Sequence, residues 1–159
     1  MLAFFSVLPE VAREETRLLK FSGHDIIPDG EYDLVEYYCG DLNCDCRRVL
    51  ISVTTNTSVP EVVAVFNYAW EPPEYYERKF ADNVLVTDYS GVHLEPLQRQ
   101  SEYAEFFREL FEEMIFVDPA YEARLRNHYV IFRAALGARA PRRSNNLVPM
   151  RRKSKKKRR

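Results

Sequence analysis

The clearest pattern of hydrophobic and polar positions lies in the last third of the chain, between residues 101 and 117. Apolar residues recur there at intervals of three and four, which places them on one face of a helix. These residues are Tyr103, Phe106, Phe107, Leu110, Phe111, Met114 and Ile115. Ser101 is a suitable N-cap for this predicted helix, because its hydroxyl can accept from an unpaired backbone N–H of the first turn.

A second helix is expected directly after the first. Asp118 followed by Pro119 is typical of a helix start, since aspartate caps the first turn and proline fits its first position. The apolar stripe of this helix is formed by Tyr121, Leu125, His128, Phe132 and Leu136. Gly137 suits the position after its last residue. Two helices joined by so short a connection are predicted to pack antiparallel across one face of a sheet.

Three segments in the middle of the chain have the pattern of β-strands. Residues 31–38 are rich in Tyr and Val, and residues 47–54 carry Val or Ile at every second position from 49 to 53. In residues 61–70 every second side chain is apolar and falls on one face. Short polar connections favour an antiparallel meander. A fourth strand is predicted near 84–88, and one or two helical turns over 74–81.

The N-terminal segment allows two interpretations. Pro9 fits the first turn of a helix, but Glu15 interrupts the apolar stripe that follows it. The segment is therefore either a short helix over 9–14 followed by a strand near 16–21, or one longer helix.

These elements predict an α+β fold, in which a small antiparallel β-meander packs against two C-terminal antiparallel helices. The chain has 159 residues, 46% hydrophobic and 13% aromatic, which is enough apolar surface for one core. The folded domain is predicted to cover 1–137, and 138–159 to form a disordered basic tail. The sequence has no run of about 18 apolar residues, so no association with a membrane is expected.

The net charge of −1 conceals a strong separation of charge along the chain. The last acidic residue is Glu122, and eleven of the 23 basic residues lie from Arg139 onward. The other 12 basic residues stand against 24 acidic ones, so the body carries about −12 and the C-terminal segment about +11.

This C-terminal charge predicts binding to RNA, DNA or the ribosome by neutralisation of phosphates. The candidate contact residues are Arg151, Arg152, Lys153, Lys155, Lys156, Lys157, Arg158 and Arg159. The alternatives are a solubilising tail, a localisation signal or an intramolecular partner of the acidic body.

All three cysteines of the chain, Cys39, Cys44 and Cys46, lie within eight positions in the hairpin between the first two predicted strands. An odd number of clustered cysteines is awkward for disulfide pairing and natural for metal coordination. Thiolates are soft ligands, so the cluster predicts a zinc knuckle. The alternatives are three free thiols or a redox pair. Clustered free thiols also indicate a reducing cytoplasm.

Zinc takes four ligands, so the three cysteines leave one ligand to be found. We expect it to be His24, which lies in a loop just before the first predicted strand. The alternatives are His93, His128, a carboxylate of Asp41 or Asp45, a water molecule, or a ligand from a second chain. Arg47 and Arg48 directly follow the cluster and are expected to offset its negative charge.

Three segments of the chain carry a resemblance to known sequences. They are the run from Gly30 to Val49, which contains the cysteines, and the runs Leu94-Glu-Pro-Leu-Gln-Arg-Gln-Ser101 and Arg126-Asn-His-Tyr129. In these segments the chain resembles a family of uncharacterised bacterial proteins. Some members carry a C-terminal SEC-C zinc-binding motif, whose second pair of ligands does not occur after residue 46 in this chain. The resemblance implies zinc bound by the three cysteines and no established activity.

The function that these features predict is a zinc-stabilised cytoplasmic binding module whose basic tail contacts nucleic acid or a nucleoprotein. An enzyme is the less favoured alternative, because the sequence has no phosphate loop, nucleophile elbow or dinucleotide fingerprint. Such an enzyme would use an open fourth zinc position with His24 or His93 as general acid or base. The third alternative is an adaptor that docks a protein partner.

Overall fold

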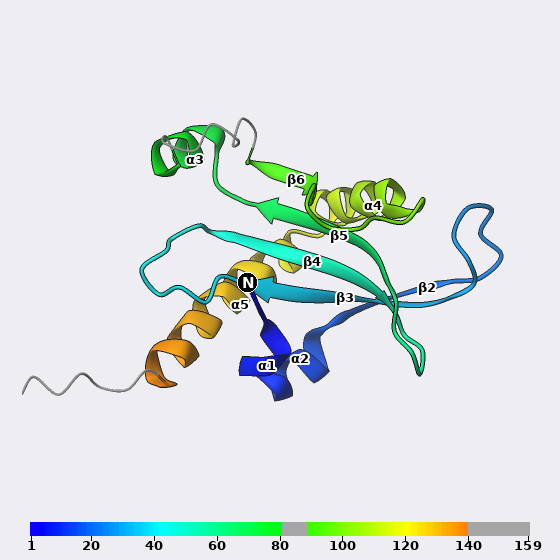
Figure 1. The fold of residues 1–159 in the computed structure, drawn as a ribbon, viewed down its shortest axis with the longest axis horizontal. Helices are drawn as coiled ribbons and strands as arrows, with labels where there is room; N and C mark the ends of the chain where they lie inside the picture. Colours follow the sequence, from blue (N-terminus) through cyan, green and yellow to red (C-terminus); the bar gives the residue numbers. More distant parts are fainter. Residues whose placement is uncertain (81–88, 140–159) are drawn as a thin grey trace, which may run out of the picture.

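The fold is described from a computed structural model, which covers residues 1–80 and 89–139 (Figure 1). Its elements in chain order are β1 (Leu2–Ala3), α1 (Phe4–Val7), α2 (Pro9–Glu15), β2 (Arg17–Phe21), β3 (Gly30–Tyr38), β4 (Arg48–Thr55), β5 (Val62–Ala69), α3 (Pro73–Lys79), β6 (Gly91–Leu94), α4 (Ala104–Val117) and α5 (Pro119–Arg139).

The strands form one six-stranded antiparallel sheet in the order β1–β3–β4–β5–β6, with β2 also paired to β3. β1 and β2 share one edge of β3: β2 pairs with residues 30–34 and β1 with residues 37–38. α1 and α2 connect these two strands (Figure 1). The N-terminal segment therefore lies along one edge of the sheet, close to the end of β3.

The predicted α+β fold is confirmed. The predicted strands 31–38, 47–54 and 61–70 correspond to β3, β4 and β5, which pair consecutively as a meander. The first of the two interpretations of the N-terminal segment is right, because α2 is followed by the separate strand β2. β1 and α1 were not expected. The strand predicted near 84–88 falls within residues 81–88, which lie outside the described residues.

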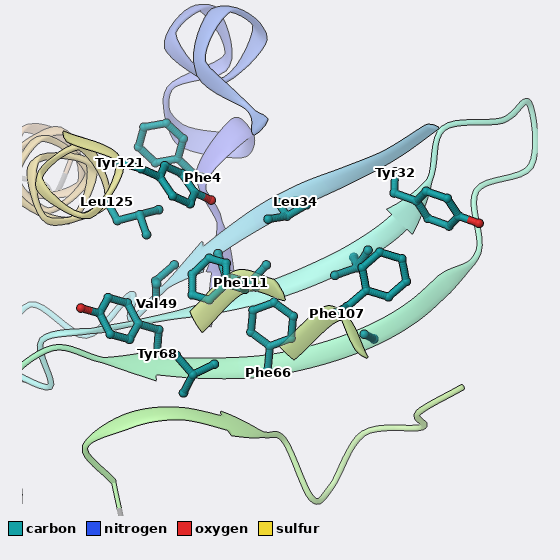
Figure 2. Close-up of a cluster of buried hydrophobic side chains, with 14 of the residues drawn as sticks. Phe4, Tyr32, Leu34, Val49, Phe66, Tyr68, Phe107, Phe111, Tyr121 and Leu125 are labelled. Carbon is teal, nitrogen blue, oxygen red and sulfur yellow. The ribbon is translucent and has the colours of Figure 1, made fainter. Parts of the chain in front are cut away.

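The core lies on the face of the sheet that is covered by helices (Figure 2). Val49, Ile51 and Val53 of β4 are all fully buried there, as their alternation in the sequence predicts. From α4, the ring of Phe111 packs 4.8 Å from that of Phe66 on β5. These contacts use the helical stripe that the 3,4 spacing of apolar residues defines.

The two C-terminal helices cover successive parts of the sheet. At the start of β3, Tyr32 packs 5.2 Å from Phe107 of α4. At the end of β3, Tyr38 packs 5.5 Å from Phe132 of α5 and donates a 3.0 Å hydrogen bond to the Leu125 carbonyl. α4 thus packs over the start of β3 and α5 over its end. α5 in this way reaches the connection between β3 and β4.

Gly137 lies within α5, which continues to Arg139, so the helix does not end before Gly137 as the sequence pattern had predicted. Arg139 donates a hydrogen bond of 2.8 Å to the carbonyl of Val7 in α1. The remaining part of the predicted basic tail, residues 140–159, lies outside the described residues. Within the described ranges, no helix is both long and apolar enough to cross a membrane.

Candidate metal centre

The three cysteines come together in the connection between β3 and β4, which we call the cysteine loop (residues 39–47). Their sulfur atoms all lie within 4.8 Å of one another. Cys46 is 2% exposed, whereas Cys39 and Cys44 are half-buried. Tetrahedral zinc with bonds of about 2.3 Å brings its sulfur ligands to about 3.8 Å from each other. Small side-chain rotations are enough to reach that distance, so the three cysteines lie close enough to bind a metal ion.

The loop makes a tight turn between its first two cysteines. Asp41 accepts a 2.8 Å hydrogen bond from the backbone N–H of Asn43 on its carboxylate and a 3.1 Å bond from the N–H of Cys44 on its carbonyl. An aspartate that bonds the backbone two residues further on is typical of such turns. This turn brings Cys44 back toward Cys39.

Arg133 of α5 holds the loop from outside. Its guanidinium donates to three backbone carbonyls, those of Cys44 at 2.5 Å, Leu42 at 2.6 Å and Asp41 at 3.2 Å. The same group lies over the ring of Tyr129, 5.3 Å from the centroid. One rigid, planar group with several donors thus ties three carbonyls of the loop to the helix.

Asp45 links the loop to α3 and α5. Its carboxylate accepts hydrogen bonds from the hydroxyl of Tyr75 at 2.9 Å, the hydroxyl of Tyr129 at 3.2 Å and the guanidinium of Arg47 at 3.2 Å. Partial burial favours the neutral acid, but the bonds from Arg47 and Tyr75 outweigh it and lower the pKa of Asp45. The carboxylate is therefore ionised and engaged by its own neighbours.

Arg47 ends the loop in an unusual backbone conformation. Its φ is +43°, in the left-handed region that residues other than glycine seldom adopt. The hydroxyl of Tyr76 donates to the Arg47 carbonyl at 2.8 Å, and the guanidinium pairs with Glu71 at 3.1 Å. Such a conformation costs about 1–3 kcal/mol and persists where surrounding contacts enforce it. Here the contacts of Arg47 hold this conformation between the buried Cys46 and the start of β4 at Arg48.

The electrostatic environment of the thiols is set mainly by Cys46. Burial, and then the neighbouring thiols of Cys44 and Cys39, raise the pKa of Cys46 to about 12, while the cation of Arg48 opposes the rise. Arg47 faces Asp45 and Glu71 instead. Of the two arginines predicted to offset the charge of the cluster, Arg48 is thus the one whose charge acts on the buried thiol.

The structure does not bring His24 to the cysteines. His24 lies before the start of β3, whereas Cys39 follows its end, and nine strand residues at about 3.3 Å each span roughly 30 Å. Its Nδ1 accepts hydrogen bonds of 3.1 Å from the N–H groups of Ile26 and Ile27. The group of three thiols contains no fourth histidine, cysteine or carboxylate from the described ranges 1–80 and 89–139. The prediction of His24 as a ligand is not supported, because the loop that contains His24 and the cysteine loop lie at opposite ends of the extended strand β3.

The other two histidines are engaged elsewhere. Nε2 of His93, on β6, lies 2.6 Å from the carbonyl oxygen of Ser90. His128 is 1% exposed on α5, where Nδ1 lies 2.7 Å from the Glu36 carboxylate and Nε2 lies 3.1 Å from that of Glu15. The placement of His128 on the buried stripe of its helix agrees with the sequence pattern.

Sequence reasoning missed the buried polar group around His128. Glu36 is 5% exposed and accepts hydrogen bonds from Tyr38 at 2.7 Å as well as facing His128. A signal was present, because Glu36 shares the alternating face of β3 with Tyr32, Leu34 and Tyr38. A carboxylate at such a position needs a buried partner, and His128 lies on the facing stripe.

Comparisons with known proteins add no relative. No family model matches the chain, no protein of curated function matches it, and no solved structure matches it. The resemblance to the bacterial family therefore stays a prediction. Fold and site together define an α+β protein with a three-cysteine cluster that is suited to a metal ion.

Proposed function

We propose that the protein is a zinc-stabilised binding module of the cytoplasm, whose basic C-terminal segment contacts nucleic acid or a nucleoprotein. The convergence of the sulfur atoms of Cys39, Cys44 and Cys46 carries this proposal. Soft thiolate ligands favour zinc over hard cations, and zinc needs no redox partner. The resemblance to the bacterial family implies zinc at these cysteines, which agrees with this choice of metal.

The charge distribution supports the second part of the proposal. Residues 140–159 carry ten basic and no acidic residues, and they follow directly after α5. A segment of this kind binds phosphates through release of counterions and without reading bases. The segment has no aromatic residue that could stack on a base, so binding independent of sequence is expected.

Metal analysis of the purified full-length protein tests the first part. We expect about one zinc per chain, and Cys44→Ser should lower both the zinc content and the melting temperature, because bound metal stabilises the folded state only. His24→Ala is the matched control, since His24 lies at the other end of β3, and it should keep its zinc. Unchanged zinc content in Cys44→Ser would remove the metal from the proposal.

Binding of a generic single-stranded RNA at several salt concentrations tests the second part. Affinity should fall steeply with salt, and a chain that ends at Arg139 should lose the binding. A chain whose residues 140–159 are in shuffled order keeps the charge and should bind as the natural chain does. Equal binding by the shortened chain would show that the segment has no such role.

A further inference from the structure

We infer that the metal in the cysteine loop keeps one coordination position for a ligand from outside the chain, and that this position favours a thiolate. The inference rests on the proposed metal site and deepens it by naming the class of the fourth ligand. It follows from how the possible protein ligands are engaged, from the exposure of the sulfurs and from the rigidity of the loop.

The nearest carboxylates are directed to other partners. The Asp45 carboxylate accepts from Arg47, Tyr75 and Tyr129, and that of Asp41 accepts from a backbone N–H within the turn. Moving either carboxylate onto a metal would break these bonds, each worth about 1.5–3 kcal/mol where a charged group takes part.

The three cysteines differ in their access to solvent. Cys46 is 2% exposed. Cys39 and Cys44 are half-exposed. An ion bound by all three sulfurs is therefore accessible to a small molecule beside these two half-exposed cysteines.

Contacts with the rest of the protein hold the cysteine loop at several points. Arg133 fixes three of its carbonyls, Tyr75 and Tyr129 fix Asp45, and Tyr76 fixes the strained residue Arg47. A small metal site in a zinc finger, by contrast, folds around its ion. A preformed set of three sulfurs can bind and release the fourth ligand without rearrangement of the chain.

Charge and softness together select the ligand. Three thiolates and a divalent ion carry a net charge of −1. Two cations lie beside the loop, since the charge of Arg48 acts on Cys46 and the guanidinium of Arg133 donates to the Cys44 carbonyl. A fourth sulfur completes the four-thiolate set that zinc accepts in closed sites. A thiol that binds here gives its proton to solvent and bonds as the thiolate.

Cobalt substitution of the full-length protein provides the test. Co²⁺ takes the same ligands, and its sulfur-to-metal absorption grows with the number of bound thiolates. In thiol-free buffer, added 2-mercaptoethanol should raise that absorption by roughly one third, from three sulfurs to four, and then saturate while the cobalt stays bound. Unchanged absorption, or loss of cobalt, would overturn the inference.

The same experiment distinguishes failure of the proposed metal site from failure of the proposed thiol ligand. If no cobalt binds at all, the proposed function fails before any thiol is added. His24→Ala and His93→Ala should leave the initial spectrum unchanged. Asp82→Asn and Asp88→Asn are included as well. These two carboxylates precede β6 in the chain and lie outside the described residues, so only the variants can test them as metal ligands. A shifted initial spectrum in any of these four variants would show that the chain supplies the fourth ligand.

Discussion

Two groups of side chains of the types that can ligate metals lie against α5, and their charges are arranged in opposite ways. Beneath β3, His128 lies between the carboxylates of Glu36 and Glu15, at 2.7 and 3.1 Å. In the cysteine loop, the thiols of Cys39, Cys44 and Cys46 face one another. The first group pairs opposite charges, whereas the second gathers donors of the same kind, which repel one another once ionised.

The difference shows which group is suited to a metal. Both ring nitrogens of His128 already have a carboxylate partner, so this group needs no metal ion. The His128 ring also stacks on Phe4 with 4.4 Å between centroids. The three thiols have no such counter-charge bonded to them among the described residues, and a cation would relieve their repulsion. Convergence of similar donors is therefore a stronger sign of a metal site than the presence of ligand residues alone.

The largest expected effect comes from breaking the buried pair. His128→Leu takes the histidine away from the buried Glu36 carboxylate, which keeps only the hydrogen bond from Tyr38. This loss should cost about 3–5 kcal/mol of unfolding free energy. Urea unfolding monitored by circular dichroism measures the loss. The double variant Glu36→Leu/His128→Leu should recover part of it, because no unpaired charge remains. Zinc content per folded chain should stay unchanged in both, and a loss of zinc would mean that the two groups are not separate.

Removing a sulfur from the other group should act on metal affinity instead. Cys46→Ser takes away the buried ligand, and the affinity for zinc should fall by at least about 100-fold, since even the loss of a residue that only orients a ligand costs 10–100-fold. Competition with a chromophoric chelator measures this affinity. An affinity within a few fold of the natural chain would argue that the three thiols do not act together.

A smaller effect is expected from Arg133, which holds the loop but donates no ligand. Arg133→Met keeps most of the side-chain length and removes the bonds to the carbonyls of Asp41, Leu42 and Cys44. Zinc affinity should fall by about 10–100-fold, the usual cost of losing support outside the ligands. Arg108→Met is the control, because this arginine of α4 pairs with Glu105 and Glu112 of its own helix, and the variant should bind zinc normally.

The smallest effect is a dependence of stability on pH. Burial disfavours the charged form of His128, but its bonds to Glu36 and Glu15 outweigh burial and raise its pKa above 6.5. A raised folded-state pKa means that this contribution to stability is fully present below about pH 6.5 and is lost as pH rises through the folded pKa. The difference in unfolding free energy between the natural chain and His128→Leu should shrink over that range. A difference that stays constant over this pH range would contradict the prediction.

Much of the fold could be predicted because its signals are local. The burial of Val49, Ile51 and Val53 follows from a two-residue period, and the buried face of α4 follows from 3,4 spacing. The clustering of three cysteines likewise follows from their closeness along the chain. β1 could not be anticipated, since two residues carry no period and their strand exists only through pairing with Tyr37 and Tyr38.

The sequence by itself therefore determined the α+β fold class, the meander and the convergence of the thiols, because each depends on residues within a few positions of one another. Only the tertiary structure decided that His24 lies at the far end of β3, that His128 pairs with Glu36, and that Arg133 holds the cysteine loop. The last two contacts join residues about 90 positions apart in the chain, and packing of α5 on the sheet, which no local period encodes, brings them together.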